Sequence, residues 1–118
     1  DHGSTFGGNP LACAVGRATM ETLVAEGIGE HVIEVGAQLA ERLAALPHVT
    51  EVRGRGLMRG AQLDAPIARS LVEQGLRAGL VLNCVGDSTL RFLPPLVVTA
   101  GQVDAMAERL AKLIGQLA

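Results

Sequence analysis

The stretch Val49-Thr-Glu-Val-Arg-Gly-Arg-Gly-Leu-Met-Arg-Gly-Ala-Gln-Leu63 decides the fold class, because the helical spacing of the preceding residues ends here. Its apolar residues do not recur every three or four positions, and glycines stand at positions 54, 56 and 60. We predict two short strands here, Val49 to Val52 and Leu57 to Leu63, separated by Arg53-Gly54-Arg55-Gly56. A glycine in a strand marks a bulge, a tight bend or a close approach of two backbones.

The arginines at positions 53, 55 and 59 of this stretch resemble the RGG tracts of RNA-binding proteins. The tract occurs once, contains no aromatic residue, and stands in a chain with a formal net charge of -2. Nucleic-acid binding relies on phosphate neutralisation and on aromatic stacking, so nucleic acid is not an expected partner. We interpret these arginines as solvated side chains around a turn.

Two helices are predicted before the strands. Asn9 is a typical helix cap and Pro10 a typical first helical residue, and Gly27 is expected to end the first helix. The second helix is predicted from Ile28 to Leu46, because its apolar residues recur at intervals of three and four. Pro47 then stops it.

Two more strands and two more helices are predicted after Leu63. Pro66 and Gly79 bracket a helix whose inward residues are Ile67, Leu71, Val72 and Leu76. The strands are Leu80 to Asn83 and Thr89 to Leu93, and the last helix opens with the capping box Thr99-Ala-Gly-Gln102. This order predicts an α+β fold with a small mixed or antiparallel sheet covered by helices.

The composition excludes several classes of protein. A chain of 118 residues with 48% hydrophobic and 19% charged residues can bury a core and is not expected to be disordered. Its longest apolar run, Leu11 to Val15, is too short for a membrane span, and no signal-peptide pattern opens the chain. Cys13 and Cys84 lie far apart, as do the histidines, so we predict no metal site and two buried cysteines in a reducing cytoplasm.

The loop His2-Gly-Ser-Thr-Phe-Gly-Gly-Asn-Pro10 is the first candidate site. Two hydroxyl residues and two adjacent glycines precede a capped helix N-terminus, and such an end attracts phosphate or carboxylate groups. The same residues are also ordinary loop formers, so a plain flexible loop fits them as well. The spacing matches neither the P-loop nor the dinucleotide-binding fingerprint.

Arg91 is the second candidate, because it stands within the apolar segment Leu90-Arg-Phe-Leu-Pro-Pro-Leu96. A buried arginine needs a carboxylate or phosphate partner, and its planar fork binds carboxylates through two points. The alternative is that strand alternation simply turns Arg91 to water. The residues by themselves leave both interpretations open.

In this order and spacing, these segments resemble the C-terminal region of the class III aminotransferases, which are pyridoxal 5'-phosphate enzymes. The resemblance covers nearly the whole chain. Within the class, Asp1-His-Gly-Ser-Thr-Phe-Gly-Gly-Asn-Pro-Leu-Ala-Cys-Ala14 and the segment around Arg91 are most similar to the acetylornithine aminotransferase branch of arginine biosynthesis. The implied fold is the C-terminal domain of the fold type I transferases, with residues 1-27 as cofactor and substrate loop with linking helix, and 28-118 as small domain.

The resemblance also implies roles for three residues. Thr5 would hydrogen-bond the cofactor phosphate of the neighbouring subunit of a homodimer, and Ser4 would lie next to the bound substrate. Arg91 would grip the α-carboxylate of the amino or keto acid. The glycine-rich strand pair would be architectural, and no function attaches to Arg59, where an apolar residue is commoner.

The resemblance further implies that the catalytic parts stand elsewhere. A transaminase needs a lysine for the Schiff base, and the sole lysine here, Lys112, is expected on the surface of the last helix. The family places the catalytic lysine and the large domain before residue 1, so we expect a fragment that is inactive alone. The alternatives are a related ω-aminotransferase acting on ornithine, succinylornithine, succinyldiaminopimelate or 4-aminobutyrate, and a non-catalytic dimerisation or binding module.

Overall fold

The computed structural model describes residues 3–117, so Asp1 and His2 of the N-terminal motif and Ala118 lie outside the described residues. The chain divides into two compact units, residues 1–30 and residues 31–118. The first unit holds helix α1 (Pro10–Ala25) and the first residues of α2 (Ile28–Ala44). The second unit holds the rest of α2 and all the other elements.

Helix α1 begins and ends where the sequence predicts. The Oδ1 atom of Asn9 accepts the Ala12 N–H at 2.9 Å, Pro10 is the first helical residue, and Gly27 follows the helix with φ of 62°. The prediction of a buried Cys13 is wrong, because α1 buries none of its side chains and Cys13 is exposed. Small apolar residues favoured the helix, but they do not by themselves supply a surface that covers it.

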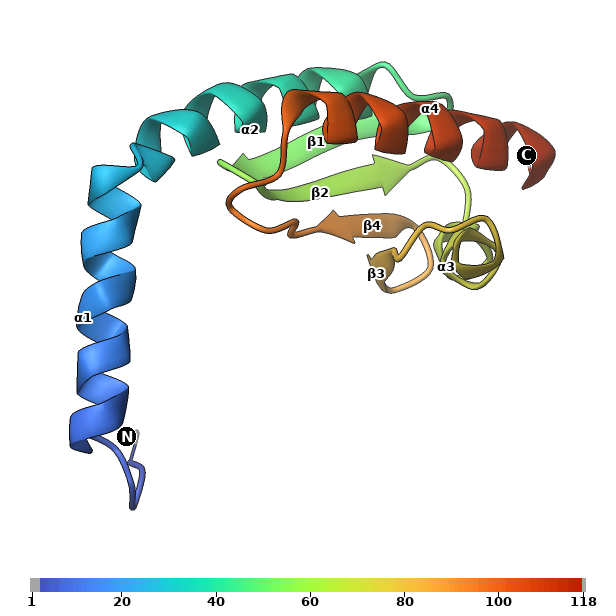
Figure 1. Cartoon of the computed structure of the whole chain (residues 1–118). Helices are drawn as coiled ribbons and strands as arrows, with labels where there is room; N and C mark the ends of the chain where they lie inside the picture. Colours follow the sequence, from blue (N-terminus) through green and yellow to red (C-terminus); the bar gives the residue numbers. More distant parts are fainter. Residues whose placement is uncertain (1–2, 118) are drawn as a thin grey trace. The chain divides into compact units, whose positions relative to one another are not determined.

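The second unit is built on a four-stranded antiparallel sheet in the order β1-β2-β4-β3, which confirms the predicted α+β class. Its strands are β1 (Val49–Arg55), β2 (Met58–Leu63), β3 (Asn83–Val85) and β4 (Thr89–Phe92). Helices α2 and α4 (Ala100–Leu117) run side by side over one face of the sheet, and α3 (Ala68–Arg77) packs against α4 and β3 (Figure 1). None of the helices among residues 3–117 is long and apolar enough to cross a membrane.

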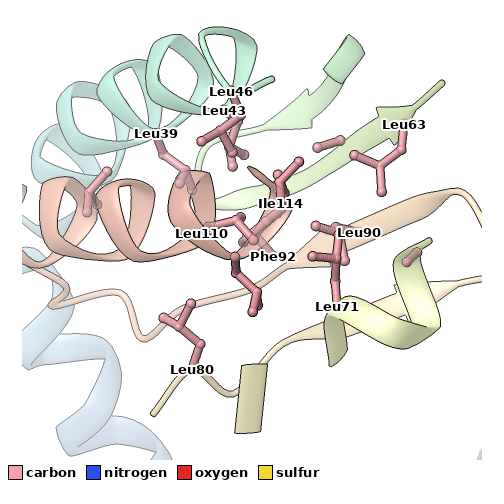
Figure 2. Close-up of a cluster of buried hydrophobic side chains, with 14 of the residues drawn as sticks. Leu39, Leu43, Leu46, Leu63, Leu71, Leu80, Leu90, Phe92, Leu110 and Ile114 are labelled. Carbon is pink, nitrogen blue, oxygen red and sulfur yellow. The ribbon is translucent and has the colours of Figure 1, made fainter. Parts of the chain in front are cut away.

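The core lies between this sheet face and the helices (Figure 2). Each burial of a leucine or isoleucine contributes about 1.5–3 kcal/mol, so a small set of residues supplies most of the apolar stabilisation. The largest fully buried side chains come from α2, α3, β4 and α4, and they are Leu39, Leu43, Leu71, Leu90, Leu110 and Ile114.

The first hairpin is tighter than predicted. Strand β1 continues through Gly54 to Arg55, which pairs with Met58, so only Gly56 and Leu57 form the turn. Gly56 has φ of 53°, and a two-residue hairpin of type II′ requires a positive φ at this first position. The glycines therefore permit a short turn and do not form a separate linker between the strands.

Arg59 is not a solvated side chain, contrary to our interpretation of the sequence. It is half-buried, and its guanidinium donates from Nε to the Gly56 carbonyl at 2.8 Å and from Nη1 to the Gly54 carbonyl at 2.9 Å. Its Nη2 donates to the carbonyl of Gly36 in α2 at 3.1 Å. One arginine thus ties the hairpin turn to the covering helix.

The predicted strand Leu80 to Asn83 is displaced toward the C-terminus. The Leu80 N–H donates to the Gly75 carbonyl at 2.8 Å and so completes the end of α3, and β3 begins only at Asn83. Leu76 was expected inward and is 69% exposed. Leu71 is buried as predicted, together with Ala68 and Gly75, and Leu76 lies about 140° around the helix from Leu71 at about 100° per residue.

Helix α4 begins with the predicted capping box and is held to α2 by polar contacts. The Thr99 N–H donates to Gln102 Oε1 at 3.0 Å, and the Gln102 N–H donates to Thr99 Oγ1 at 3.2 Å. Arg42 Nε and Gln38 Nε2 both donate to Asp104 Oδ1, at 2.7 and 2.9 Å. The Arg42 guanidinium, helped by the Gln38 amide, holds the pKa of the Asp104 carboxyl below its ordinary value of 3.8.

Asp104→Asn is expected to flatten the acid side of the stability profile of the chain. The folded-state pKa of Asp104 is the lower one, so its contribution is complete above the unfolded-state pKa and is lost as the pH falls through the folded-state pKa. Denaturant midpoints measured from about pH 6 to about pH 2.5 test this. Glu34→Gln, on the exposed side of α2, is the charge-matched control, and an equal response of both variants would contradict the prediction.

Candidate functional site

The candidate site lies on the sheet face opposite α2 and α4, which we call the open face and define by Glu51, Arg53, Gln62, Thr89 and Arg91. Successive side chains of a strand point to opposite faces. Leu90 and Phe92 of β4 are buried against the helices, so Arg91 between them is exposed on the open face. The structure therefore supports the interpretation in which strand alternation turns the Arg91 side chain to water.

Strand register places Arg91 in a row that crosses the sheet. Arg91 lies opposite Gly60 of β2 on one side and opposite Asn83 of β3 on the other. Gly60 in turn lies opposite Arg53 of β1. Directly opposed residues share a face and bring their Cβ atoms to about 5 Å, so Asn83 is a side-chain neighbour of Arg91.

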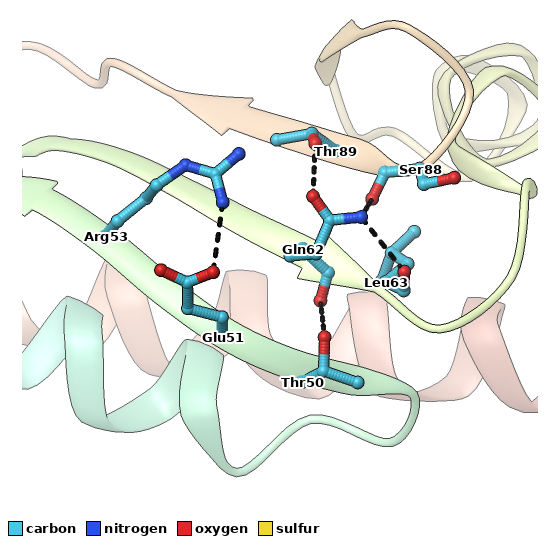
Figure 3. Close-up of polar contacts among 7 residues, drawn as sticks. All are labelled: Thr50, Glu51, Arg53, Gln62, Leu63, Ser88 and Thr89. Atoms are coloured by element: carbon cyan, nitrogen blue, oxygen red, sulfur yellow. Dashed lines mark hydrogen bonds and ion pairs between the residues drawn. The ribbon is translucent and has the colours of Figure 1, made fainter.

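Polar contacts fix the strands around this row (Figure 3). The Gln62 amide donates to the carbonyls of Leu63 and Ser88, both at 3.1 Å, and accepts the Thr89 hydroxyl at 2.9 Å. Arg53 Nη1 pairs with Glu51 Oε2 at 3.3 Å. Among the described residues, Arg91 makes no such pair, so its charge is available to a ligand.

A hollow of about 490 Å³ opens at the edge of the sheet next to Arg91, on the side covered by the helices, because Leu39 of α2 and Val103 of α4 help to line it. Arg91 is the sole charged residue among those that line it, and the polar members besides it are the amides Asn83 and Gln102. The remaining lining residues are apolar, among them Leu82, Leu93 and Pro94. An apolar hollow with one cation and few polar groups suits a small carboxylic acid.

The hydroxyl residues Ser4 and Thr5 belong to the first unit, where they lie exposed in the turn before α1. The Gly7 N–H donates to the Ser4 carbonyl at 3.2 Å, and no acidic residue stands in the first turn of α1. Gly8 has φ of 79° and no heavy atom near its missing Cβ. This loop fits a phosphate group, because hydroxyls, open backbone and a helix N-terminus favour an anion.

Among the described residues, neither candidate site contains a lysine that could form a Schiff base with an aldehyde cofactor. The sole lysine, Lys112, is exposed on α4, as predicted. Within residues 3–117, no three His, Cys, Asp or Glu side chains gather to hold a metal ion. The described residues therefore offer two places whose chemistry suits an anion, the Ser4–Thr5 turn and Arg91.

Asn83 is the site residue that our sequence analysis passed over. It was taken as the last residue of an apolar strand, whereas the structure makes it the first residue of β3 and the neighbour of Arg91. A three-residue turn over 86–88 sets this register, since it pairs Val85 with Thr89. Assigning that turn from Gly86 and Asp87 would have revealed the pair.

Comparison with known proteins gives consistent results. Residues 1–114 match the family model of the class-III aminotransferases. The chain is 47% identical to the acetylornithine aminotransferase of Gloeobacter violaceus, covering 100% of this chain and 30% of that protein. It is also 47% identical to an ornithine aminotransferase of Bordetella pertussis, covering 99% of this chain and 29% of that protein.

Solved structures agree with the sequence matches. The acetylornithine aminotransferase of Elizabethkingia anophelis matches with a TM-score of 0.84 at 31% identity, over 98% of this chain and 31% of that one. The ornithine aminotransferase of Toxoplasma gondii matches with a TM-score of 0.82 at 32% identity, over 98% of this chain and 29% of that one. The chain thus spans about 30% of the length of these relatives.

Proposed function

The chain belongs to the class-III aminotransferase family, and from this membership we propose that it forms the C-terminal part of an acetylornithine aminotransferase. The complete enzyme would move an amino group between N-acetylornithine and 2-oxoglutarate in arginine biosynthesis, in the cytoplasm. Relatives named acetylornithine aminotransferase, matched along the whole of this chain, support the assignment. Their greater length supports a further, catalytic portion of the polypeptide.

The exposed Arg91 at the rim of an apolar hollow carries the proposal. Both proposed substrates are carboxylic acids, and a guanidinium binds a carboxylate through two parallel N–H donors. Strand β4 is paired on both sides and anchored by the buried Leu90 and Phe92, so the Arg91 backbone is held firmly. In the proposed enzyme Arg91 anchors the α-carboxylate and so orients the amino or keto group for reaction.

Pyridoxal 5'-phosphate, the cofactor implied by the family, acts as an electron sink for the carbon from which the proton leaves. We assign Thr5 to its phosphate and Ser4 to the edge of the substrate pocket. Both hydroxyls would serve the site of the neighbouring subunit of a homodimer. The Schiff-base lysine would come from the catalytic portion, since Lys112 stands on α4, so the 118-residue chain alone would be inactive.

Ornithine is the second candidate for the amino donor. An ornithine aminotransferase is as similar to this chain as an acetylornithine aminotransferase, at 47% identity. The two donors share the α-carboxylate that Arg91 would bind and the distal amine that is transferred, and they differ at the α-nitrogen, which carries an acetyl group in N-acetylornithine. Other ω-aminotransferase donors, namely succinylornithine, succinyldiaminopimelate and 4-aminobutyrate, belong in the same assay.

The decisive experiment is an amino-transfer assay of the complete protein encoded by the parent reading frame. It is supplied with pyridoxal 5'-phosphate and 2-oxoglutarate, and each of the five donors is offered in turn. We expect N-acetylornithine to give the highest kcat/KM. A preference for another donor would correct the substrate, and a native product of only 118 residues without transfer activity would favour the binding-module alternative.

Arg91→Gln in the complete enzyme is expected to raise KM for both substrates about tenfold, because a charge-assisted two-point contact is lost. Thr5→Ala is the companion variant, expected to weaken cofactor retention on dialysis and to leave both KM values near wild type once cofactor is saturating. Steady-state kinetics and the cofactor absorbance measure the two effects. Unchanged KM values in Arg91→Gln would remove Arg91 from the substrate site.

A further inference from the structure

Asn83 stands beside Arg91, where a second residue could bind the substrate carboxylate. It lies directly opposite Arg91 in the β3–β4 ladder, and both residues line the same hollow. Both side chains are exposed, so each reaches solvent and any solute in it. The neighbour of Arg91 on the other side is Gly60, which has no side chain to offer.

One hydrogen bond orients the Asn83 amide. Its Oδ1 accepts the backbone N–H of Cys84 at 2.8 Å. A backbone N–H can be bound only by the amide oxygen, so Nδ2 and its two hydrogens face away from Cys84. No acceptor for Nδ2 occurs among the hydrogen bonds of the described residues. The amide therefore presents donors and no free carbonyl to solvent on the face that it shares with Arg91.

We propose that Asn83 is a second carboxylate-binding residue, which donates from Nδ2 to the carboxylate held by Arg91. A carboxylate has two oxygens with about four acceptor positions, and the arginine fork occupies only two of them. An adjacent amide donor satisfies a third position without adding charge. The inference rests on the proposed role of Arg91. It adds Asn83 as the residue that would fix the orientation of the bound carboxylate.

The nearby alternatives are weaker candidates for this role. Gln102 also lines the hollow, but it stands on α4 and is not a strand neighbour of Arg91 as Asn83 is. Arg53 lies two strands away from Arg91 across Gly60, about 10 Å between backbones at normal strand spacing, and is already paired with Glu51. Asn83 alone combines adjacency to Arg91 with an unused donor among the described residues.

The test is a titration of the 118-residue chain with butyrate, monitored by NMR. Butyrate replaces chloride, so that the ionic strength stays constant. The Asn83 Nδ2 hydrogens and the Arg91 Nε–H are expected to shift along one common binding curve. If the Arg91 Nε–H shifts along a binding curve and the Asn83 Nδ2 hydrogens do not shift, the inference is overturned and the role of Arg91 stands. No response of either group would overturn both.

Asn83→Asp separates binding from local structure. The aspartate keeps an oxygen for the Cys84 N–H but replaces the donors with a negative charge beside Arg91, so butyrate is expected to bind about tenfold more weakly. Gln116→Glu, an equal change of charge on the exposed side of α4, should leave the affinity unchanged. Wild-type affinity in Asn83→Asp would show that the asparagine has only a structural role and would overturn the proposal.

Discussion

Gly36→Ala is expected to destabilise the chain by about 3 kcal/mol, although alanine is the better helix former by about 1 kcal/mol. A Cβ atom at position 36 would stand 2.6 Å from the carbonyl oxygen of Gly56 and 2.7 Å from its carbonyl carbon. These are backbone atoms of the hairpin turn, which cannot rotate away as the end of a side chain can. Helix α2 would have to lift from the hairpin, and the steric cost exceeds the gain in helix propensity.

Gly115→Ala is the matched control for this prediction. Gly115 is also an interior helical glycine, in α4, and no heavy atom lies within 4 Å of its missing Cβ. At this position the substitution changes only the helix propensity, so it is expected to stabilise the chain by up to about 1 kcal/mol. Urea midpoints followed by circular dichroism measure both variants. A stabilising Gly36→Ala would show that α2 and the hairpin are not in close contact in solution.

Arg59→Ala is expected to destabilise by about 2 kcal/mol, because three carbonyl oxygens lose a charged donor at once. The acceptors are the carbonyls of Gly36, Gly54 and Gly56, and the Arg59 side chain is half-buried between them. Water can reach part of this region and replace some of the lost bonds, which keeps the expected effect below the sum of three separate losses. Denaturant midpoints again provide the measurement.

Arg53→Ala is the control for Arg59. Arg53 belongs to the same hairpin, but its partner is the exposed Glu51, and such surface pairs contribute about 0–1 kcal/mol. The double variant Gly36→Ala with Arg59→Ala should be less destabilised than the sum of the two single variants, because both act on the contact between α2 and the turn. Equal effects of Arg53→Ala and Arg59→Ala, or strict additivity, would contradict this view of the contact.

The sequence predicted the helices well because their signals are local. Asn9 with Pro10 fixed the start of α1, and Thr99 with Gln102 formed the expected capping box of α4. The inward stripe of α2, from Val35 through Leu39 to Leu43, is buried as its spacing predicts. Leu76 and Cys13 were misplaced because burial depends on what covers a side chain, and spacing along one helix does not say this.

The site was predicted in part. Arg91 was singled out by its charge within an apolar segment, and Ser4 and Thr5 by their place before a helix; their roles remain proposals. Asn83 carries no signal of its own, since an asparagine at the start of a strand is an ordinary residue. Its interest arises only from the register that sets it opposite Arg91.

The amino-acid sequence by itself determined the fold class, the four helices, the caps of α1 and α4 and the resemblance to the class-III aminotransferases, because these depend on patterns within short stretches of chain. The tertiary structure decided the strand register, the burial of Arg59 and the contact between Gly36 and Gly56. These features join residues 20 or more positions apart in α2 and the hairpin, or residues on different strands. Such pairings follow from how the helices and the sheet pack together, which no local pattern encodes.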